Sequence, residues 1–180
     1  HLFDRWTVIA LACADGEEDH LKAVFHLEGS GESAFTTAIA ERLNTKASSV
    51  TSMVLKLAEK GLLTHRPYRG VNLTRKGRAL AVALVRKHRL WETFLVERLG
   101  FGWEEVHEVA EQLEHIHSIK LIDRLDAYLA HPSTDPHGEP IPDKEGRVKA
   151  REWKRLSELK SGSSGRVTAV NDRSAAFLDY

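Results

Sequence analysis

The chain has 180 residues, of which 42% are hydrophobic, and it carries 26 basic and 26 acidic side chains. This length is enough for one large domain or two small ones with a substantial core. Its single cysteine, Cys13, excludes a disulfide within the chain, and the apolar run from Val8 to Ala14 is too short to span a bilayer. We therefore expect a cytoplasmic protein with no membrane partner.

The neutral total charge hides a strong segregation along the chain. Residues 34–98 contain 13 Lys and Arg against 4 Asp and Glu, whereas residues 101–150 contain 5 against 11. The first segment is therefore expected to attract a polyanion, and the second to attract cations.

The first helix is predicted from Glu17 to Glu28, because its apolar residues recur at helical spacing and glycines follow it. Asp19 lies early in this helix and off its apolar stripe. Taken alone, this carboxylate is typical of a helix N-terminus. Residues 1–16 are treated as an N-terminal arm of unknown role.

Two short helices separated by a tight turn are predicted next. Thr36 or Thr37 would cap the first, and Ser48 or Ser49 would begin the second, which Gly61 ends. This order is that of a helix-turn-helix motif. Small hydroxyl-bearing and basic side chains suit a helix in the major groove of DNA. The expected DNA contacts are Thr36, Lys46, Ala47, Ser48, Ser49, Thr51, Ser52 and Lys56.

A basic β-hairpin is predicted directly after the second helix. Residues 62–66 and 71–74 have the pattern of two strands around the turn at residues 67–70. A basic hairpin in this place is typical of the wing of a winged helix, so Arg66, Tyr68 and Arg69 are expected to meet phosphate or the minor groove. The alternative is a surface hairpin with incidental arginines.

Two further segments place metal-binding residue types on shared helix faces. In a long helix from Arg75 to Leu99, capped by Thr74, His88 and Glu92 are four residues apart. A second helix is predicted across residues 106–115, within a helical region from Trp103 to His117. There Glu111, Glu114 and His115 would share one face, with His107 one turn earlier.

Carboxylate and imidazole donors suit manganese, iron(II), cobalt or zinc. The alternative interpretation is a solvated acidic face with incidental histidines. A further helix from Ser118 to Ala130 and a proline-rich loop from Pro132 to Pro142 follow in the sequence.

The stretch from Glu18 to Pro142 resembles the DtxR/MntR family of metal-dependent transcriptional regulators. The resemblance rests on motifs that stand in the family's order: Glu18-Asp19-His20-Leu21, Ile39-Ala40-Glu41-Arg42-Leu43, Ser48-Ser49-Val50-Thr51, Tyr68-Arg69-Gly70, Leu73-Thr74-Arg75-Lys76-Gly77, Arg86-Lys87-His88-Arg89-Leu90, Glu114-His115 and Gly138-Glu139-Pro140-Ile141-Pro142.

The resemblance implies a mainly α fold with a small β-wing. It implies a winged helix-turn-helix DNA-binding domain over residues 17–85 and an α-helical metal-binding and dimerisation domain over 86–142. A linker over 143–155 would lead to an incomplete SH3-like, FeoA-type β domain over 156–180.

The resemblance also implies two metal sites per subunit. The first site would use Asp19, Glu111, Glu114 and His115, and the second would use His88, Glu92 and His107. Lys22 stands where the manganese branch carries a carboxylate ligand, and an ammonium cannot bind a cation. We therefore predict two separate sites rather than a binuclear cluster of the manganese type.

The first site lacks sulfur donors, which favours manganese(II), with iron(II) as the alternative. Zinc(II) or cobalt(II) would substitute in vitro.

The expected function is that of a metal-dependent repressor of metal-ion homeostasis, not of an enzyme. It would bind double-stranded operator DNA as a homodimer when Mn(II) or Fe(II) is bound, and no other small molecule would be its substrate. One alternative is a metal-dependent hydrolase that uses the Glu/His cluster to activate water. Another is a winged-helix DNA-binding protein with no metal role.

Overall fold

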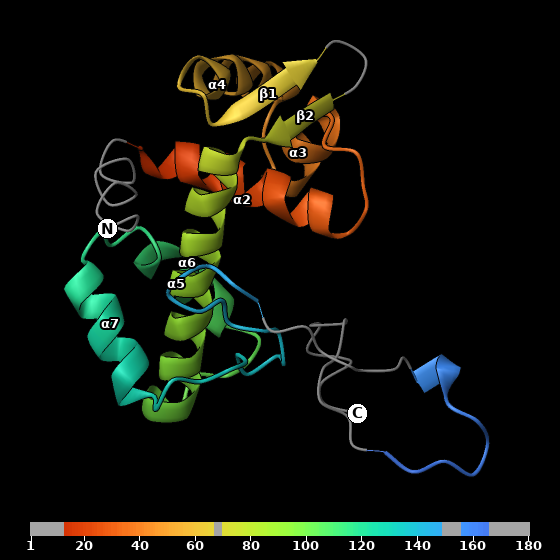
Figure 1. Ribbon diagram of the computed structural model, residues 1–180, viewed down its shortest axis with the longest axis vertical. Coiled ribbons are helices and arrows are strands. Elements are labelled where there is room, and N and C mark those ends of the chain that lie inside the picture. The colour runs from red at the N-terminus through yellow and green to blue at the C-terminus, as the bar shows by residue number, and fades with distance from the viewer. Residues whose placement is uncertain (1–12, 67–69, 149–155, 166–180) are drawn as a thin grey trace. The chain divides into compact units, whose positions relative to one another are not determined.

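The computed structural model describes residues 13–66, 70–148 and 156–165 (Figure 1). The chain divides into two compact units, His1–Val85 with His115–Ile119, and Arg86–Glu114 with Lys120–Tyr180. We refer to them as the first and the second unit. Tyr68, Arg69, most of the predicted arm, part of the linker and residues 166–180 of the predicted SH3-like domain lie outside the described residues. Within the described part, no helix is long and apolar enough to cross a membrane.

Three helices form the body of the first unit: α2 (Asp15–Gly29), α3 (Thr36–Arg42) and α4 (Ala47–Glu59). The first turn of α2 contains acidic side chains, which favour a helix N-terminus. Each helix buries an apolar stripe, represented by Leu21 in α2, Ile39 in α3 and Val54 in α4. The predicted helix-turn-helix, made by α3 and α4, is confirmed.

The helix starts differ slightly from the prediction. Phe35 occupies the N-cap of α3 and Lys46 that of α4, and neither helix has a side-chain cap. Thr36 is therefore inside its helix, and the expected hydroxyl caps are wrong. The chain reverses between the helices at Asn44, whose φ is 48°, a left-handed conformation that asparagine adopts more readily than most residues.

The predicted wing is confirmed as an antiparallel pair, β1 (Leu63–Arg66) and β2 (Gly70–Leu73), with Leu63 opposite Leu73. Figure 1 shows the two strands beside α4, which packs against β1. The Val71 amide donates to the carbonyl of Ala34 at 2.9 Å, so β2 is also tied to the chain before α3.

Helix α5 (Arg75–Leu99) begins at a close contact with the chain before the wing. The Thr74 hydroxyl accepts a hydrogen bond from the Gly77 amide at 3.0 Å and donates to the Gly61 carbonyl at 2.8 Å. A Cβ on Gly77 would lie 1.9 Å from the Leu62 carbonyl oxygen. Thr74 therefore caps the helix as predicted. At position 77 only glycine fits, because any side chain would collide with the Leu62 carbonyl.

A buried ion pair joins α2 to α4 inside the first unit. Glu17 is 1% exposed, and its carboxylate lies 2.9 Å from the Lys56 ammonium and 2.7 Å from that of Lys60. Burial alone would raise the pKa of Glu17, but hydrogen bonds from Lys60, Lys56 and the Ala14 amide outweigh it and lower the pKa to about 2. The pair therefore fixes the C-terminal half of α4 against the first turn of α2.

The second unit contains residues 86–99 of α5, with α6 (Val106–Leu113), α7 (Ile119–Tyr128) and the short 3₁₀ helix η1 (Leu156–Glu158). Its buried apolar side chains include Leu90, Leu95, Val106, Ala110, Ile122 and Leu125.

Helix α6 is shorter than the periodicity predicts, because it ends at Leu113. Glu114 and His115 therefore lie just beyond the end of the helix rather than inside it, and the predicted helix end is wrong. Glu114 is fully buried against His88, and His115 contacts Glu18 instead. These tertiary contacts override the local helical pattern.

A tight loop follows α7, and hydrogen bonds between its own residues hold it closed. The Asp135 amide donates to the Glu139 carbonyl, and the Glu139 amide donates back to Asp135 Oδ1, at 2.9 and 2.8 Å. Ile141 donates to the Ser133 carbonyl at 3.0 Å. Gly138 supplies the positive φ of 85° that the reversal requires. The loop thereby buries Asp135 and His137.

Replacing Glu17 tests the ion pair between α2 and α4. We expect Glu17→Gln to lower the free energy of unfolding of the first unit by roughly 1–3 kcal/mol near neutral pH, the range for charged hydrogen bonds. The pKa of Glu17 is lower in the folded state, so this stabilisation is present above about pH 4 and disappears as the pH falls towards 2. Urea denaturation followed by circular dichroism, at neutral and at acid pH, measures the free energy of unfolding of the wild type and the variant. Exposed Glu59→Gln is the control, and an equal loss in both variants would contradict the assignment.

Candidate functional site

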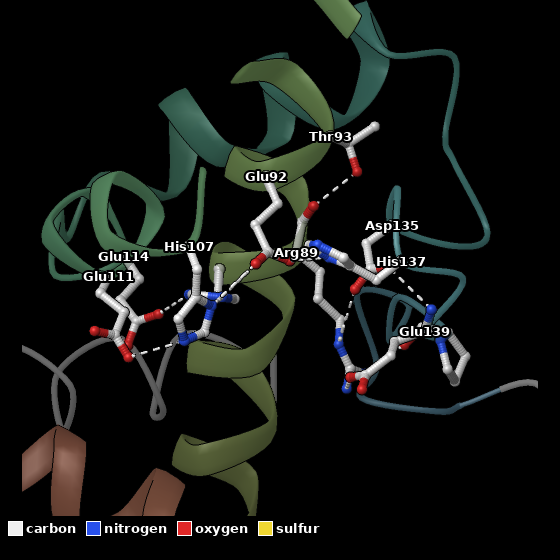
Figure 2. A network of polar contacts seen from close by, with 11 residues as sticks. Arg89, Glu92, Thr93, His107, Glu111, Glu114, Asp135, His137 and Glu139 are labelled. Carbon is white, nitrogen blue, oxygen red and sulfur yellow. Dashed lines mark hydrogen bonds and ion pairs between the residues drawn. The ribbon is translucent and has the colours of Figure 1, made fainter. Parts of the chain in front are cut away.

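Glu92 is the centre of a buried polar cluster in the second unit (Figure 2). Helix α5 places His88 one turn before it, so both side chains point to the same side. Glu92 Oε1 lies 3.0 Å from His88 Nε2 and 3.1 Å from Nδ1 of His107, which α6 supplies. The two imidazole nitrogens are themselves 3.0 Å apart. The structure thus brings together the predicted trio His88, Glu92 and His107 with their donor atoms converging.

The second nitrogen of His88 is held by Glu114. Nδ1 donates to Glu114 Oε2 at 2.5 Å, and Glu114 is 0% exposed. A cation bound in place of the Nε2 proton that faces Glu92 would meet a ring that still donates from Nδ1, an arrangement found around many metal-binding histidines. Glu114, which the sequence assigns to the first predicted site, is therefore in direct contact with a member of the second.

Two residues that the sequence analysis did not select lie at the other oxygen of Glu92. His137 Nδ1 is 3.7 Å from Glu92 Oε2, and Glu92, Asp135 and His137 form a second group of donor atoms within 4.8 Å of one another. All three side chains are buried. The only sequence signal for Asp135 and His137 is their spacing around Pro136 in a proline-rich loop, which alone does not predict burial.

The pKa values of the two buried carboxyl groups are shifted in opposite directions. Burial raises the pKa of Asp135, the charge on Glu92 raises it further, and the result is about 6. Burial would also raise the pKa of Glu92, but hydrogen bonds from His107, His137 and His88 hold it well below its usual range. The histidines therefore favour the anionic form of Glu92, whereas the surroundings of Asp135 disfavour its anionic form.

Arg89 anchors the loop that carries Asp135 and His137. Its guanidinium donates to the Pro140 carbonyl at 2.6 Å and pairs with the Glu139 carboxylate, and its Nε lies 3.7 Å from Asp135 Oδ2 (Figure 2). A planar guanidinium can hold several oxygens at once. Arg89 was not selected from the sequence, although it lies beside His88 on α5.

Glu111 belongs to the edge of this cluster. Its side chain is exposed, and Oε1 lies 3.3 Å from His107 Nε2. The structure therefore connects Glu111 to the trio of the second predicted site, through the ring nitrogen of His107 that faces away from Glu92.

In the first unit, His115 faces the start of α2. His115 Nδ1 lies 2.8 Å from Glu18 Oε2, and His115 Nε2 lies 3.2 Å from Asp19 Oδ1. Glu18 is buried, and its other oxygen is 3.8 Å from His117 Nδ1. Asp19 and His115, two residues of the first predicted site, are thus in contact. Glu18 also contacts His115, and His117 lies near Glu18. The predicted four-residue site also names Glu111 and Glu114, which belong to the second unit.

The expected DNA contacts lie largely on the exposed face of the helix-turn-helix. Thr36 is half-buried and Arg66 of the wing is exposed. Lys56 is more than half exposed, but its ammonium is paired with Glu17. The expected contacts that are exposed in the turn and in α4 include Lys46, Ala47, Ser48, Ser49, Thr51 and Ser52.

Two family profiles cover most of the chain. The N-terminal DNA-binding domain of iron-dependent repressors matches residues 14–71, and their metal-binding and dimerisation domain matches residues 74–143. The iron-dependent repressor IdeR of Mycobacterium leprae is 38% identical over 156 residues, covering 83% of this chain and 68% of that protein. IdeR of Mycobacterium tuberculosis H37Rv is 42% identical over 128 residues, which are 71% of this chain but only 56% of the relative's length.

Solved structures give the same result. A manganese-dependent transcriptional repressor in complex with manganese has a TM-score of 0.78 and 40% identity, covering 91% of this chain and 76% of its own. The manganese regulator SloR has a TM-score of 0.70 and 37% identity, covering 80% and 67%. The resemblance stated from the sequence is confirmed: the chain belongs to the family of iron- and manganese-dependent transcriptional repressors.

Proposed function

We propose that this protein is a metal-dependent repressor of metal-ion homeostasis, which binds operator DNA as a homodimer when Mn(II) or Fe(II) is bound. The observation that carries the proposal is the convergence of imidazole and carboxylate donors on buried Glu92, in a chain that also forms a winged helix. Its family is one of transcriptional repressors rather than enzymes.

The residues of the second unit fit a divalent cation. Glu92 and Asp135 are buried side by side, and their mutual repulsion is part of what raises the pKa of Asp135. A cation between them would neutralise this repulsion. Both donor groups contain only imidazole nitrogens and carboxylate oxygens, which suits Mn(II) and Fe(II) and also accommodates Zn(II) or Co(II).

Two donor groups of the second unit are the proposed ligands. His88, Glu92 and His107 form one, and Glu92, Asp135 and His137 form the other. Glu114 orients His88 through its Nδ1 proton. A bound cation would supply a fixed positive charge that holds α5, α6 and the loop after α7 together. Metal binding would thereby order the unit that the family uses for dimerisation.

The first predicted site, Asp19, Glu111, Glu114 and His115, is retained as a proposal from the sequence and the resemblance. Its support in the structure is the contact between Asp19 and His115 within the first unit. If an ion bound by these residues favours the arrangement of the chain that binds DNA, metal and DNA must tighten each other's binding, because coupling between two ligands is reciprocal.

The DNA-binding face has the chemistry to contact a duplex. The exposed hydroxyl of Thr51 donates to the Ala47 carbonyl at 2.9 Å and that of Ser52 to the Ser48 carbonyl at 3.2 Å. Lys46 and Arg66 are exposed and carry the charge that phosphate contacts require. Tyr68 and Arg69 of the wing remain predicted contacts.

Metal-dependent DNA binding is the direct test of this function. Duplexes are selected from a random library with the Mn(II)-loaded protein, and affinity is then measured by fluorescence anisotropy with Mn(II), with anaerobic Fe(II) and with chelator. We expect the affinity to fall at least about tenfold without metal, which corresponds to roughly 1.4 kcal/mol. His88→Gln should show the same loss in the presence of Mn(II).

Two controls make the result specific. Exposed Glu97→Gln, on the same helix as His88, should retain full metal dependence. Lys46→Ala should weaken binding to every duplex and make it less sensitive to salt, because it removes one phosphate contact. Equal affinity with metal and with chelator would show a winged-helix DNA-binding protein without metal control.

The raised pKa of Asp135 predicts opposite effects of one substitution on stability and on metal binding. The folded-state pKa of about 6 exceeds the ordinary value of about 3.9. The metal-free protein therefore loses stability as the pH rises through about 6. We expect Asp135→Asn to stabilise the metal-free protein by about 1–3 kcal/mol at pH 8, with no gain below about pH 4, and to weaken Mn(II) binding.

Thermal unfolding across this pH range and calorimetric titration with Mn(II) measure the two effects. Asp123→Asn, which is partly exposed and paired with Lys144, is the matched control. A variant that is destabilised at pH 8, or that binds Mn(II) as tightly as the wild type, would contradict the role given to Asp135.

A further inference from the structure

A side chain of α2 covers the outer edge of the wing. Val71 and Leu73 are alternate residues of β2, so the amides of both point away from β1. The Val71 amide donates to the Ala34 carbonyl, and the Leu73 amide donates to Glu28 Oε1 at 2.9 Å. Figure 1 shows α2 next to β2, and the two elements pack together. The carboxylate of Glu28 thus accepts a backbone amide that a neighbouring strand would otherwise bind.

The other oxygen of Glu28 contacts the start of α5. Glu28 Oε2 accepts a hydrogen bond from the guanidinium of Arg78, which also lies 6.0 Å from the centre of the Phe25 ring. Glu28 therefore binds the chain on both sides of Thr74, at the last residue of the wing and near the first residue of the next helix. Its side chain is only 17% exposed, so these contacts are partly shielded from water.

Neither charge of this pair is favoured by its own helix. Glu28 lies in the last turn of α2, where the helix dipole favours cations, and Arg78 lies at the start of α5, where the dipole favours anions. Pairing the two residues offsets both unfavourable positions. The placement of Glu28 and Arg78 is therefore explained by the junction that they form between α2, the wing and α5.

The direction of the wing depends on contacts at its base. The sheet of the described residues consists of β1 and β2, and a two-stranded hairpin is marginally stable by itself. On one side β1 packs against α4, and on the other side β2 packs against α2. Exposed Arg66 lies at the far end of β1, opposite Gly70, so its position follows the orientation of the whole hairpin.

We propose that Glu28 is a positioning residue for the wing, which holds the basic side chains of the wing where they meet the DNA backbone. In this role Glu28 does not touch DNA. It fixes the Leu73 amide and the Arg78 guanidinium, and through them the orientation of the hairpin. The inference rests on the proposed DNA-binding function, and it adds a residue of α2 that is not among the expected DNA contacts.

Amide hydrogen exchange, followed by NMR on the metal-free chain without DNA, tests the contact itself. We expect Glu28→Ala to make the Leu73 amide exchange at least about tenfold faster, because its acceptor is removed. The Thr74 amide, which donates to the Leu62 carbonyl, should keep its rate. Glu28→Gln retains an oxygen that can accept the hydrogen bond, so it should keep most of the protection. Equal exchange of Leu73 in the wild type and in Glu28→Ala would overturn the proposal.

A double-mutant cycle in DNA binding tests the positioning role. Fluorescence anisotropy gives the affinity of the Mn(II)-loaded full chain for its selected duplex. We expect Glu28→Ala alone to weaken binding about tenfold, a size found for coupled positions. In a chain that already carries Arg66→Ala and Arg69→Ala, the same substitution should have almost no further effect, because the contacts that Glu28 positions are gone. Long-range electrostatics predicts the opposite sign, since removal of a carboxylate favours binding to a polyanion.

Three further variants make the cycle specific. Glu32→Ala removes an exposed carboxylate just after α2 and should not weaken binding. Lys46→Ala lies before α4 and not in the wing, so its loss should add to that of Glu28→Ala. Glu28→Gln should lose less affinity than Glu28→Ala, and circular dichroism shows whether each variant is folded. Losses from Glu28→Ala and from the two wing arginines that simply add would overturn the proposal.

The outcomes separate this inference from the proposed function. If the wild type binds DNA only with metal but the losses of the cycle add, the positioning role of Glu28 is wrong and the repressor function stands. If no duplex binds the wild type, the proposed function is wrong, and the DNA role of Glu28 is wrong with it even where the exchange of Leu73 confirms the contact.

Discussion

Burial of the Glu92 carboxylate is the constraint on which the second unit depends. A buried anion is costly unless hydrogen bonds or cations compensate it. Here the compensation comes from His88, His107 and His137, which belong to three separate segments. The position of α6 and of the proline-rich loop is therefore linked to the ionisation and ligation of one side chain on α5. A divalent cation bound at Glu92 would therefore act on all three segments.

The first unit also contains a buried carboxylate, and there lysine ammonium groups compensate its charge. Glu17 is as deeply buried as Glu92, but the ammonium groups of Lys56 and Lys60 neutralise it permanently. Helix α4 is thus attached to α2 by ion pairs that require no metal. The next two residues of α2, Glu18 and Asp19, contact His115, and Asp19 is a proposed metal ligand. One helical turn therefore combines a permanent anchor with candidate ligands.

The sequence predicts the winged helix, the long α5 and the pair His88 and Glu92, because each depends on local periodicity or on spacing within one helix. The family resemblance adds His107 to this pair. The sequence does not predict where α6 ends, since burial of Glu114 against His88 is a tertiary contact. It also misses Asp135 and His137, because their approach to Glu92 depends on a loop that closes on itself and on the anchor Arg89. Residues brought together by such packing leave no periodic signal.

The most direct test of the central role of Glu92 is anomalous diffraction from crystals of the Mn(II)-loaded protein. The account predicts two manganese peaks beside Glu92, one near His88 and His107 and the other near Asp135 and His137. Manganese bound elsewhere in the chain, with no peak at either oxygen of Glu92, would contradict it.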